Sequence, residues 1–187
     1  MDILTRLSSE QAARRLLGCL LEREIGNRRI QVKIVETEAY DQADAASHSY
    51  NGRTPRTDVM FGPAGHLYVY FTYGMHYCCN VVVGEEGHGA AVLIRAVEPL
   101  ENTEILAKHR QGKTGVELTN GPAKLCQALL IDKGLNGHDL REAPLRLILQ
   151  PALSHNDIVQ TTRIGIRRAK GVLWRFYIRG NDYVSAI

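Results

Sequence analysis

The 187-residue chain lacks the cysteine patterns of disulfide-rich and zinc-binding proteins. Its four cysteines, Cys19, Cys78, Cys79 and Cys126, form no Cys-x-x-Cys pair, and adjacent cysteines are poorly placed for an ordinary disulfide. We therefore expect buried free thiols. A chain of this length can bury about two-thirds of its unfolded surface, so a hydrophobic core is enough to hold the fold together.

Long hydrophobic segments are also missing. No apolar run approaches the ~18 residues that would suggest a membrane span. Asp2, Arg6 and Glu10 stand where a signal peptide would be hydrophobic. These observations predict an intracellular protein without a membrane partner, in the cytoplasm or nucleoid if its source is bacterial.

Sequence motifs for metals and nucleotide cofactors are absent. His48, His66, His76 and His88 never occur in a His-x-x-x-His or His-Glu-x-x-His pattern. The glycine-rich phosphate-binding motifs and the Gly-x-Ser-x-Gly motif do not occur either. We therefore expect neither a metal nor a cofactor.

The overall composition is that of an ordinary globular protein. Hydrophobic residues make up 44% of the chain and charged residues 23%, which excludes disordered, collagen-like and coiled-coil classes. The length predicts a single domain over residues 1–187. The net charge of +3 allows a nucleic-acid partner but is smaller than that of a dedicated nucleic-acid-binding tail.

Hydrophobic periodicity predicts helices scattered among strands. Ser8 and Gln11 form a capping pattern that predicts an amphipathic helix ending near Gly18. Another predicted helix follows Pro99, and a third begins at residues 121–122 and stops at Gly134. The predicted strands are residues 30–38, 66–73, 77–83, 90–97, 145–149, 173–178 and 183–186. This pattern favours an α+β fold with a mostly antiparallel, curved, open-barrel-like sheet, surrounding helices and a protruding hairpin.

Two glutamates are unusual in the strand predicted at residues 30–38. With regular pairing, Val32, Ile34, Glu36, Glu38 and Tyr40 would share one face, although carboxylates rarely accompany aliphatic residues in a core strand. The segment 41–63 follows, rich in Asp, Ala, Ser, Asn, Gly and Pro. Loops of this length in compact domains are usually functional, so we expect it to form one wall of a site.

Aromatic residues are concentrated in the predicted hairpin. Five of the twelve aromatics of the chain are Tyr68, Tyr70, Phe71, Tyr73 and Tyr77. The hairpin turns at residues 74–76, so that an aromatic residue and a methionine form its tip. Aromatics concentrated in this way favour stacking on a flat ligand over even packing in a core.

Basic residues complete the pattern. Arg95 lies within the buried strand predicted at 90–97 and requires an acidic partner there. No acidic residue occurs between positions 163 and 179, where the sequence predicts either a phosphate-facing stripe or a solvated basic face. The basic side chains of this segment are Arg163, Arg167, Arg168, Lys170, Arg175 and Arg179.

These parts suit hydrolysis of a bond in a nucleic acid. A glutamate can hold a water opposite the leaving group and accept its proton as the sugar develops positive charge. The spacing does not choose between Glu36 and Glu38, because both would lie on one strand face.

Several motifs, in order and at compatible spacing, carry a family resemblance. They are VETEAY at 35–40, His48, TPR at 54–56, MF at 60–61, LYVY at 67–70, YGM at 73–75, Asn80, RAVEP at 95–99, GPAKLC at 121–126 and RIG at 163–165. Together they closely resemble the alkyladenine (3-methyladenine) DNA glycosylase family over nearly the whole chain. The segment between Tyr40 and His48 is slightly shorter than in the family pattern.

The resemblance implies a monofunctional DNA glycosylase of base-excision repair. Such an enzyme flips a damaged nucleotide out of double-stranded DNA, hydrolyses the N-glycosidic bond of an alkylated or deaminated purine such as 3-methyladenine or hypoxanthine, and leaves an abasic site. We expect it to act as a monomer.

The resemblance also implies roles for individual residues. Glu38 is the general base, Arg95 and the backbone carbonyl of Ile164 hold the water, and Glu36 is structural. Tyr40, His48 and Tyr70 enclose the flipped base, and Asn80 excludes the 2-amino group of guanine. Tyr73 is the wedge that fills the vacated stack, and it is helped by Met75. Arg56, Lys124 and Arg163 contact DNA.

Simpler interpretations of these residues remain open. Tyr73 could be a turn residue, Tyr40 and Tyr70 could pack in the core, and Arg95 could form a structural ion pair. Asn80 could satisfy a hydrogen bond at the base of the hairpin. Two other functions are also open, namely a non-catalytic module that binds damaged nucleic acid and a hydrolase of free nucleosides.

Overall fold

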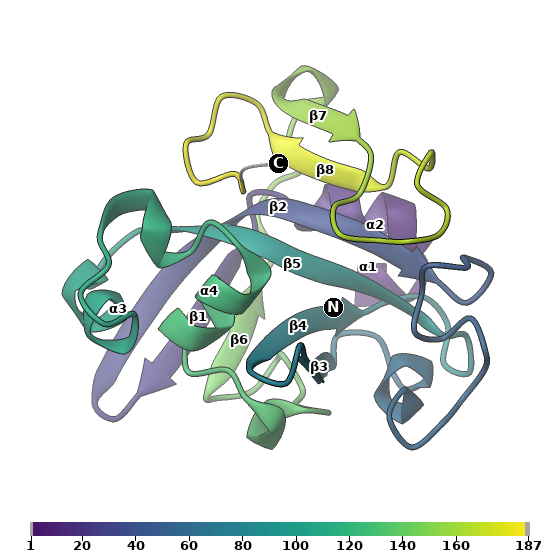
Figure 1. Cartoon of the computed structure of the whole chain (residues 1–187), viewed down its shortest axis with the longest axis horizontal. Coiled ribbons are helices and arrows are strands. Elements are labelled where there is room, and N and C mark those ends of the chain that lie inside the picture. The colour runs from purple at the N-terminus through teal and green to yellow at the C-terminus, as the bar shows by residue number, and fades with distance from the viewer. Residues whose placement is uncertain (1, 186–187) are drawn as a thin grey trace.

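The chain folds into a curled, half-barrel sheet with short helices packed around it (Figure 1). The computed structural model describes residues 2–185. Six strands follow the order β3-β4-β5-β2-β1-β6, while β8 pairs with β2 and β7 pairs with β8. Every strand pairing is antiparallel, which confirms the predicted α+β class.

The elements are short apart from two central strands. The strands are β1 Leu20–Ile25, β2 Arg28–Asp41, β3 Leu67–Thr72, β4 His76–Val82, β5 Ala90–Pro99, β6 Leu145–Ile148, β7 Ile158–Thr161 and β8 Arg175–Ile178. The α-helices are α1 Asp2–Thr5, α2 Ser9–Leu16, α3 Thr103–His109 and α4 Pro122–Ala128. The 3₁₀ helices are η1 Asp58–Phe61, η2 Gly115–Leu118, η3 Lys133–Leu135 and η4 His155–Asp157.

The predicted N-terminal helix corresponds to α2 and begins with the expected capping box. The Gln11 amide donates to the Ser8 hydroxyl, and the Ser8 amide donates to the Gln11 side chain. The two bonds satisfy backbone amides that have no partner within the helix. Ala12, Ala13 and Leu16 are fully buried in the main hydrophobic core, so the helix covers the sheet with its apolar face.

Helix α4 ends earlier than predicted. Its last residue is Ala128, and Gly134 lies in the separate helix η3. Leu130 has a φ of 48°, its amide donates to Gln127 and the next amide, Ile131, donates to Cys126. This pair of bonds is a Schellman motif, which ends a helix through one left-handed residue. The prediction at Gly134 was wrong because a leucine takes the position where glycine is usual.

A β-bulge in β2 corrects the predicted face of that strand. Ile34 pairs with Val97 and Glu36 pairs with Ala96, so Val35 is an extra residue on β2. Thr37 then pairs with Ile94, so Arg95 is an extra residue on β5. Ile34 and Ala39 therefore belong to the same hydrophobic core although their numbers differ in parity. The bulge shifts the alternation by one residue. Val32 and Ile34 face the core, whereas Glu38 and Tyr40 face a cavity.

One predicted strand is not formed in the described residues, and two strands, β1 and β7, were not predicted. Residues 183–185 form a turn rather than a strand, and Ala186 lies outside the described residues. Strand β1 escaped notice because its sequence LLEREI shows little alternation. Its two glutamates find a cationic partner on β6, where Arg146 contacts Glu22 at 3.5 Å and Glu24 at 2.6 Å. Ion pairs between distant positions thus stabilise a strand with a weak local signal.

The hairpin β3-β4 has the predicted turn and exposed tip. Tyr73 and Gly74 have φ angles of 52° and 69°, and the Met75 amide donates to the Thr72 carbonyl. A non-glycine residue at positive φ is uncommon, so the turn holds Tyr73 in a specific outward pose. The Tyr73 side chain is 83% exposed and Met75 is 68% exposed.

Two general expectations can be compared with the described residues. All four cysteines are buried and free, as predicted. Between residues 2 and 185, no helix has the length and hydrophobicity needed to cross a membrane.

Candidate active site

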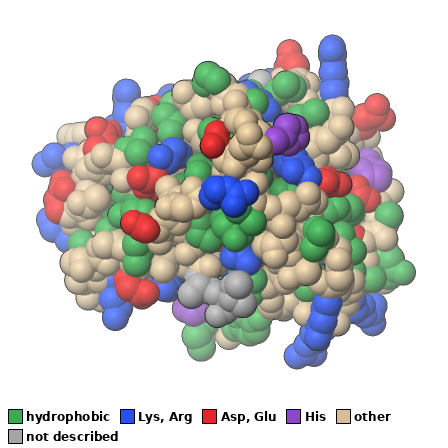
Figure 2. Space-filling view, turned by 90° about the horizontal axis from the view of Figure 1, so that it is seen from above, with side chains coloured by type: hydrophobic (Ala, Val, Ile, Leu, Met, Phe, Trp, Pro, Cys, Tyr) green, Lys and Arg blue, Asp and Glu red, His purple; other side chains and the backbone are tan. Residues whose placement is uncertain are grey.

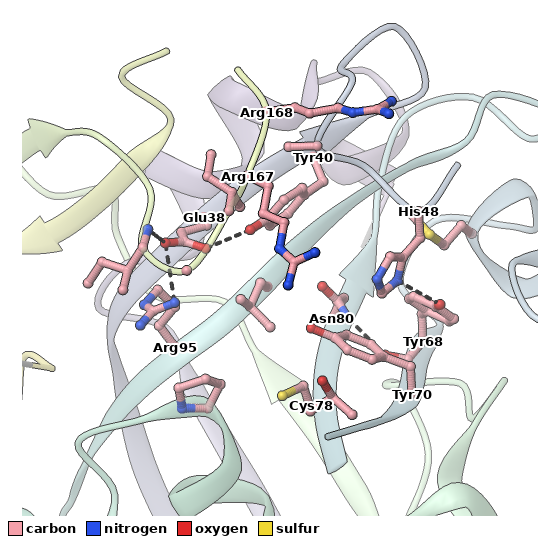
Figure 3. A pocket seen from close by; sticks show the side chains of 18 of the residues that line it. Glu38, Tyr40, His48, Tyr68, Tyr70, Cys78, Asn80, Arg95, Arg167 and Arg168 are labelled. Atoms are coloured by element: carbon pink, nitrogen blue, oxygen red, sulfur yellow. Dashed lines mark hydrogen bonds and ion pairs between the residues drawn. The ribbon is translucent and has the colours of Figure 1, made fainter. Parts of the chain in front are cut away.

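A cavity of about 600 Å³ lies next to the hairpin, on the face of the sheet to which Glu38 and Tyr40 point (Figure 3). Its floor comes from β2, β3, β4 and β5, and its walls come from the predicted loop after β2 and the loop between β7 and β8. Side chains from these segments that line it are Glu38, Tyr40, Ala45, Ala46, His48, Met60, Tyr68, Tyr70, Cys78, Asn80, Leu93, Arg95, Ile164, Arg167 and Arg168.

The strand register brings the floor residues into one row. Glu38 pairs with Leu93, Leu93 pairs with Asn80, and Asn80 pairs with Tyr68. Residues directly opposite each other on one sheet face have neighbouring side chains. The carboxylate, the amide and the tyrosine therefore lie on a common surface, although they come from three different strands.

Glu38 is the carboxylate at the inner end of this row. Its Oε1 accepts a hydrogen bond of 2.8 Å from the Ile164 amide and lies 3.3 Å from the Arg95 guanidinium. Its Oε2 accepts a 2.8 Å bond from the Tyr40 hydroxyl. Three donors thus fix both oxygens and stabilise a negative charge. The side chain is buried although it borders the cavity.

Glu36 has a different environment. Its carboxylate contacts the Arg175 guanidinium at 2.6 Å and accepts hydrogen bonds from the Ser185 amide at 2.7 Å and the Ser185 hydroxyl at 3.0 Å. It is fully buried and does not line the cavity. These contacts agree with the predicted structural role, with Arg175 as the principal partner.

Arg95 connects the two glutamates. Its guanidinium lies 3.3 Å from each carboxylate, and the two glutamates are the acidic partners predicted for a buried arginine. Burial by itself would lower the pKa of Arg95, but the negative charges of Glu38 and Glu36 outweigh burial and raise it above its ordinary value. A permanently charged guanidinium therefore stands beside Glu38.

Tyr40 forms one wall, and Arg163 lies behind it. The guanidinium of Arg163 stacks 4.7 Å from the Tyr40 ring centre and 5.4 Å from the ring of Trp174. It also donates to the Ala39 carbonyl and forms a buried ion pair with Asp44. Burial and the adjacent Glu38 charge raise the pKa of Tyr40, which keeps its phenol protonated.

The opposite wall consists of His48, Tyr68 and Tyr70. The rings of Tyr68 and Tyr70 stack at 5.7 Å, and His48 meets Tyr70 edge-on at 4.6 Å. Nδ1 of His48 shares a 3.1 Å hydrogen bond with the Tyr68 hydroxyl. Burial, and secondarily the charge of Arg56, lower the pKa of His48 to about 4. The imidazole is therefore neutral near neutral pH.

Asn80 lies on the floor between the two walls (Figure 3). Its side chain is 5% exposed and donates a 3.2 Å hydrogen bond to the Tyr68 carbonyl, at the hairpin base. The neighbouring Cys78 also borders the cavity, and burial raises the pKa of its thiol to about 11. The floor thus presents an amide held in one orientation and a neutral thiol.

The basic stripe is not continuous on the surface. Arg163 and Arg175 are 5% and 2% exposed and pair with buried carboxylates. Arg163 therefore does not face the surface in this structure, and its contact with DNA stays a prediction. Figure 2, seen from above β7 and β8, shows basic side chains interspersed with acidic ones. The members that remain exposed are Arg167, Arg168, Lys170 and Arg179.

The other two predicted DNA contacts lie at the surface. Arg56 is exposed, with its guanidinium 5.8 Å from the Tyr70 ring centre. Lys124 contacts Glu117 at 3.1 Å and donates to Asn120 at 2.7 Å, so its ammonium has protein partners. Arg56 thus stands at the cavity while Lys124 mainly supports the start of α4.

Sequence reasoning missed the residues that support the site. Asp44 and Ser185 gave no signal in the sequence, yet they hold Arg163 and Glu36. Arg167 was grouped with the stripe, whereas it lines the cavity. Among residues 2–185, no three His, Cys, Asp or Glu side chains gather as a metal-binding group.

Comparison with known proteins identifies relatives along nearly the whole chain. Residues 3–182 match the family described as Methylpurine-DNA glycosylase. The chain is 53% identical over 174 residues to a protein of Carboxydothermus hydrogenoformans, covering 92% of this chain and 91% of that protein. It is 48% identical to one of Methanoculleus marisnigri, covering 92% and 91%, and 45% identical to one of Francisella tularensis subsp. tularensis, covering 99% and 97%. All three bear the name "Putative 3-methyladenine DNA glycosylase".

Proposed function

The chain belongs to the methylpurine-DNA glycosylase family, and we propose from this premise how its cavity acts as the active site of a 3-methyladenine DNA glycosylase. The enzyme is an N-glycosyl hydrolase of DNA repair. The substrates are alkylated or deaminated purines in double-stranded DNA, including 3-methyladenine and hypoxanthine. The product is an abasic site.

Glu38 activates the attacking water. The water oxygen forms a bond to C1′ of the deoxyribose, the C1′–N9 bond breaks with its electron pair going to the base, and a water proton passes to Glu38. No covalent enzyme intermediate is required. The proposal is supported by the three donors that hold the Glu38 carboxylate in the cavity wall, since they orient a charged base toward the reacting centre.

Arg95 and Ile164 complete the water site. Arg95 neutralises part of the buried negative charge of Glu36 and Glu38 and offers further donors near the water. The Ile164 amide is already bonded to Glu38, and its carbonyl is the proposed acceptor for the second water proton. The attacking water occupies the cavity beside Glu38, which borders it.

The flipped base lies between the tyrosine walls. Tyr40 on one side and Tyr70 on the other supply flat π surfaces, which attract a cationic alkylated purine more than a normal base. His48, edge-on to Tyr70, closes the same side of the cavity. Flipping costs a few kcal/mol of stacking and pairing energy. Tyr73 and Met75, exposed at the hairpin tip, offset part of that cost by filling the gap that the base leaves.

The burial of Glu38 is the observation that carries this function. A non-catalytic binding module has no use for a buried carboxylate at the inner end of its pocket, because burying a charge costs free energy and repels DNA. A hydrolase of free nucleosides would use the pocket but would gain nothing from the exposed hairpin tip.

Matched glutamine variants test the assignment. We expect Glu38→Gln to bind lesion-containing duplex normally but to lose at least about 100-fold in single-turnover base release, since an amide cannot accept the proton. Glu36→Gln should instead lower the free energy of unfolding by about 3–5 kcal/mol, because Arg175 loses its buried partner.

The outcome is read by release of 3-methyladenine and hypoxanthine from duplexes and by urea unfolding of both variants. Loss of base release in a stable Glu36→Gln protein, with Glu38→Gln active, would reverse the assignment. Turnover of free nucleosides but not of duplex would replace the glycosylase with a nucleoside hydrolase.

A further inference from the structure

We propose that Arg167 stabilises the departing base when the lesion is a neutral purine, and that it thereby extends the reaction beyond cationic alkylpurines. This inference rests on the proposed function, because it concerns the leaving group of the same hydrolysis. It assigns a role in substrate specificity to a residue that sequence reasoning treated only as part of a basic stripe.

The position of Arg167 is the first observation. The residue lies in the loop between β7 and β8, three positions after Ile164, and lines the cavity. Figure 3 shows its guanidinium pointing into the space between Tyr40 and Tyr70, where the flipped base is proposed to stack. The neighbouring Arg168 extends along the rim, away from that space.

The absence of a protein partner is the second observation. No hydrogen bond or ion pair joins the Arg167 side chain to another residue between positions 2 and 185, and it is exposed. In contrast, Arg95 is committed to two glutamates and Arg163 to Asp44. The donors of Arg167 are therefore available to a ligand, and its long side chain can shift toward the edge of an entering base.

The charge of the leaving group explains why such a donor matters. When the C1′–N9 bond breaks in a neutral purine such as hypoxanthine, the bonding electron pair stays on N9. The base therefore departs as an anion, which later takes a proton from solvent. When the purine is methylated at N3 or N7, it starts as a cation and leaves neutral. A fixed positive charge next to the base stabilises an anionic leaving base but not a neutral one.

Hydrogen-bond geometry favours the same lesions. The O6 and N7 acceptors on the edge of a 6-oxopurine match the two-pronged donor of a guanidinium. Hypoxanthine presents both acceptors, whereas 7-methylguanine has lost N7 as an acceptor and carries positive charge. Arg167 thus forms two hydrogen bonds with the neutral lesion and is repelled by the cationic one. Glu38 activates the water for both lesions.

Single-turnover release of hypoxanthine and 7-methylguanine from otherwise identical duplexes tests the proposal. We expect Arg167→Gln to slow hypoxanthine release about 10- to 100-fold, as for loss of one charged donor to a developing anion. Release of 7-methylguanine should be unchanged or faster. Arg167→Lys keeps the charge but loses the two-pronged geometry, so its hypoxanthine rate should lie between those of the parent and Arg167→Gln.

Lys170→Gln is the matched control, because it removes an exposed positive charge from the same loop outside the cavity. Any weaker binding to phosphates in that variant affects both substrates alike and leaves their rate ratio unchanged. An equal loss on both substrates in Arg167→Gln, or an unchanged ratio, would overturn the proposal and make Arg167 a phosphate contact. Failure of the parent enzyme to release either base would instead reject the proposed function.

Discussion

Two glutamates separated by one residue show how partners decide the role of a side chain. Glu36 and Glu38 are both fully buried and both contact Arg95. Glu36 is held by a second arginine, which satisfies its charge within the protein. Glu38 is held by a phenol and an amide and borders the cavity, so its charge remains available for chemistry.

Asn80 is expected to reject guanine by steric exclusion. We predict that Asn80→Ala opens space for the 2-amino group and raises release of 7-methylguanine relative to hypoxanthine, by several-fold or more. The measurement is the ratio of single-turnover rates for the two lesions in the variant and the parent.

Asn80→Leu serves as the control because it keeps roughly the size of the side chain without adding a charge. Its ratio should stay closer to that of the parent than the ratio of Asn80→Ala. If both variants leave the ratio unchanged, Asn80 only donates its hydrogen bond to the Tyr68 carbonyl.

Asp44 is expected to be essential for stability. Its ion pair with Arg163 is buried on both sides, with side-chain exposures of 3% and 0%. Asp44→Asn leaves a buried guanidinium without a counter-charge and should lower the free energy of unfolding by about 3–5 kcal/mol. Urea denaturation followed by circular dichroism measures the change.

The exposed pair of Arg53 and Asp58 is the comparison for Asp44. Both of its side chains are 59% exposed, so Asp58→Asn should change stability by less than about 1 kcal/mol. Equal effects of the two substitutions would show that the buried pair contributes nothing beyond surface electrostatics.

At the scale of elements, the hairpin and the bulge shape the site. The bulge at Val35 turns Glu38 and Tyr40 toward the cavity while Ile34 stays in the core. The hairpin places Tyr70 on the cavity side and Tyr73 at its exposed end. The irregular pairing of β2 with β5 and one turn therefore position the base-binding wall and the wedge.

The wedge role of Tyr73 predicts a dependence on DNA structure. Tyr73→Ser should weaken binding to lesion-containing duplex and slow base release from it about 10-fold or more, since no ring fills the stack. Release from single-stranded DNA should fall much less, because there is no complementary stack to fill. Parallel assays on the two substrates measure the difference.

Tyr50→Ser controls for loss of any exposed tyrosine, because Tyr50 is 46% exposed but lies outside the hairpin. It should leave the duplex-to-single-strand ratio at the value of the parent. An equal loss on both substrates in Tyr73→Ser would remove the wedge role.

At the scale of the whole molecule, charge distribution matters more than the net charge of +3. Arg163 and Arg175 are buried, so the exposed cations near the cavity are fewer than the sequence implies. With about four phosphate contacts, affinity for undamaged duplex should fall roughly 100-fold between ~50 and ~200 mM salt. Binding isotherms across that range measure the slope, and a flat response would favour the nucleoside hydrolase.

The sequence by itself determined the fold class and most of the elements, whereas the roles of the site residues stay predictions. Apolar alternation, the capping box at Ser8 and the aromatic hairpin are local patterns, and local patterns predict local structure. The predicted hairpin, the buried strand with Arg95 and the free thiols all agree with the structure. The motifs carried the family resemblance because they are short and contiguous.

Only the tertiary structure decided which partners these residues have. The hydrogen bond from Ile164 to Glu38 spans 126 positions, and the ion pair of Arg175 with Glu36 spans 139. The bulge that separates Glu38 from Ile34 depends on pairing with β5, and the burial of Arg163 depends on Asp44. Long-range contacts of this kind leave no periodic trace in the sequence, because each residue is matched to a surface that exists only after folding.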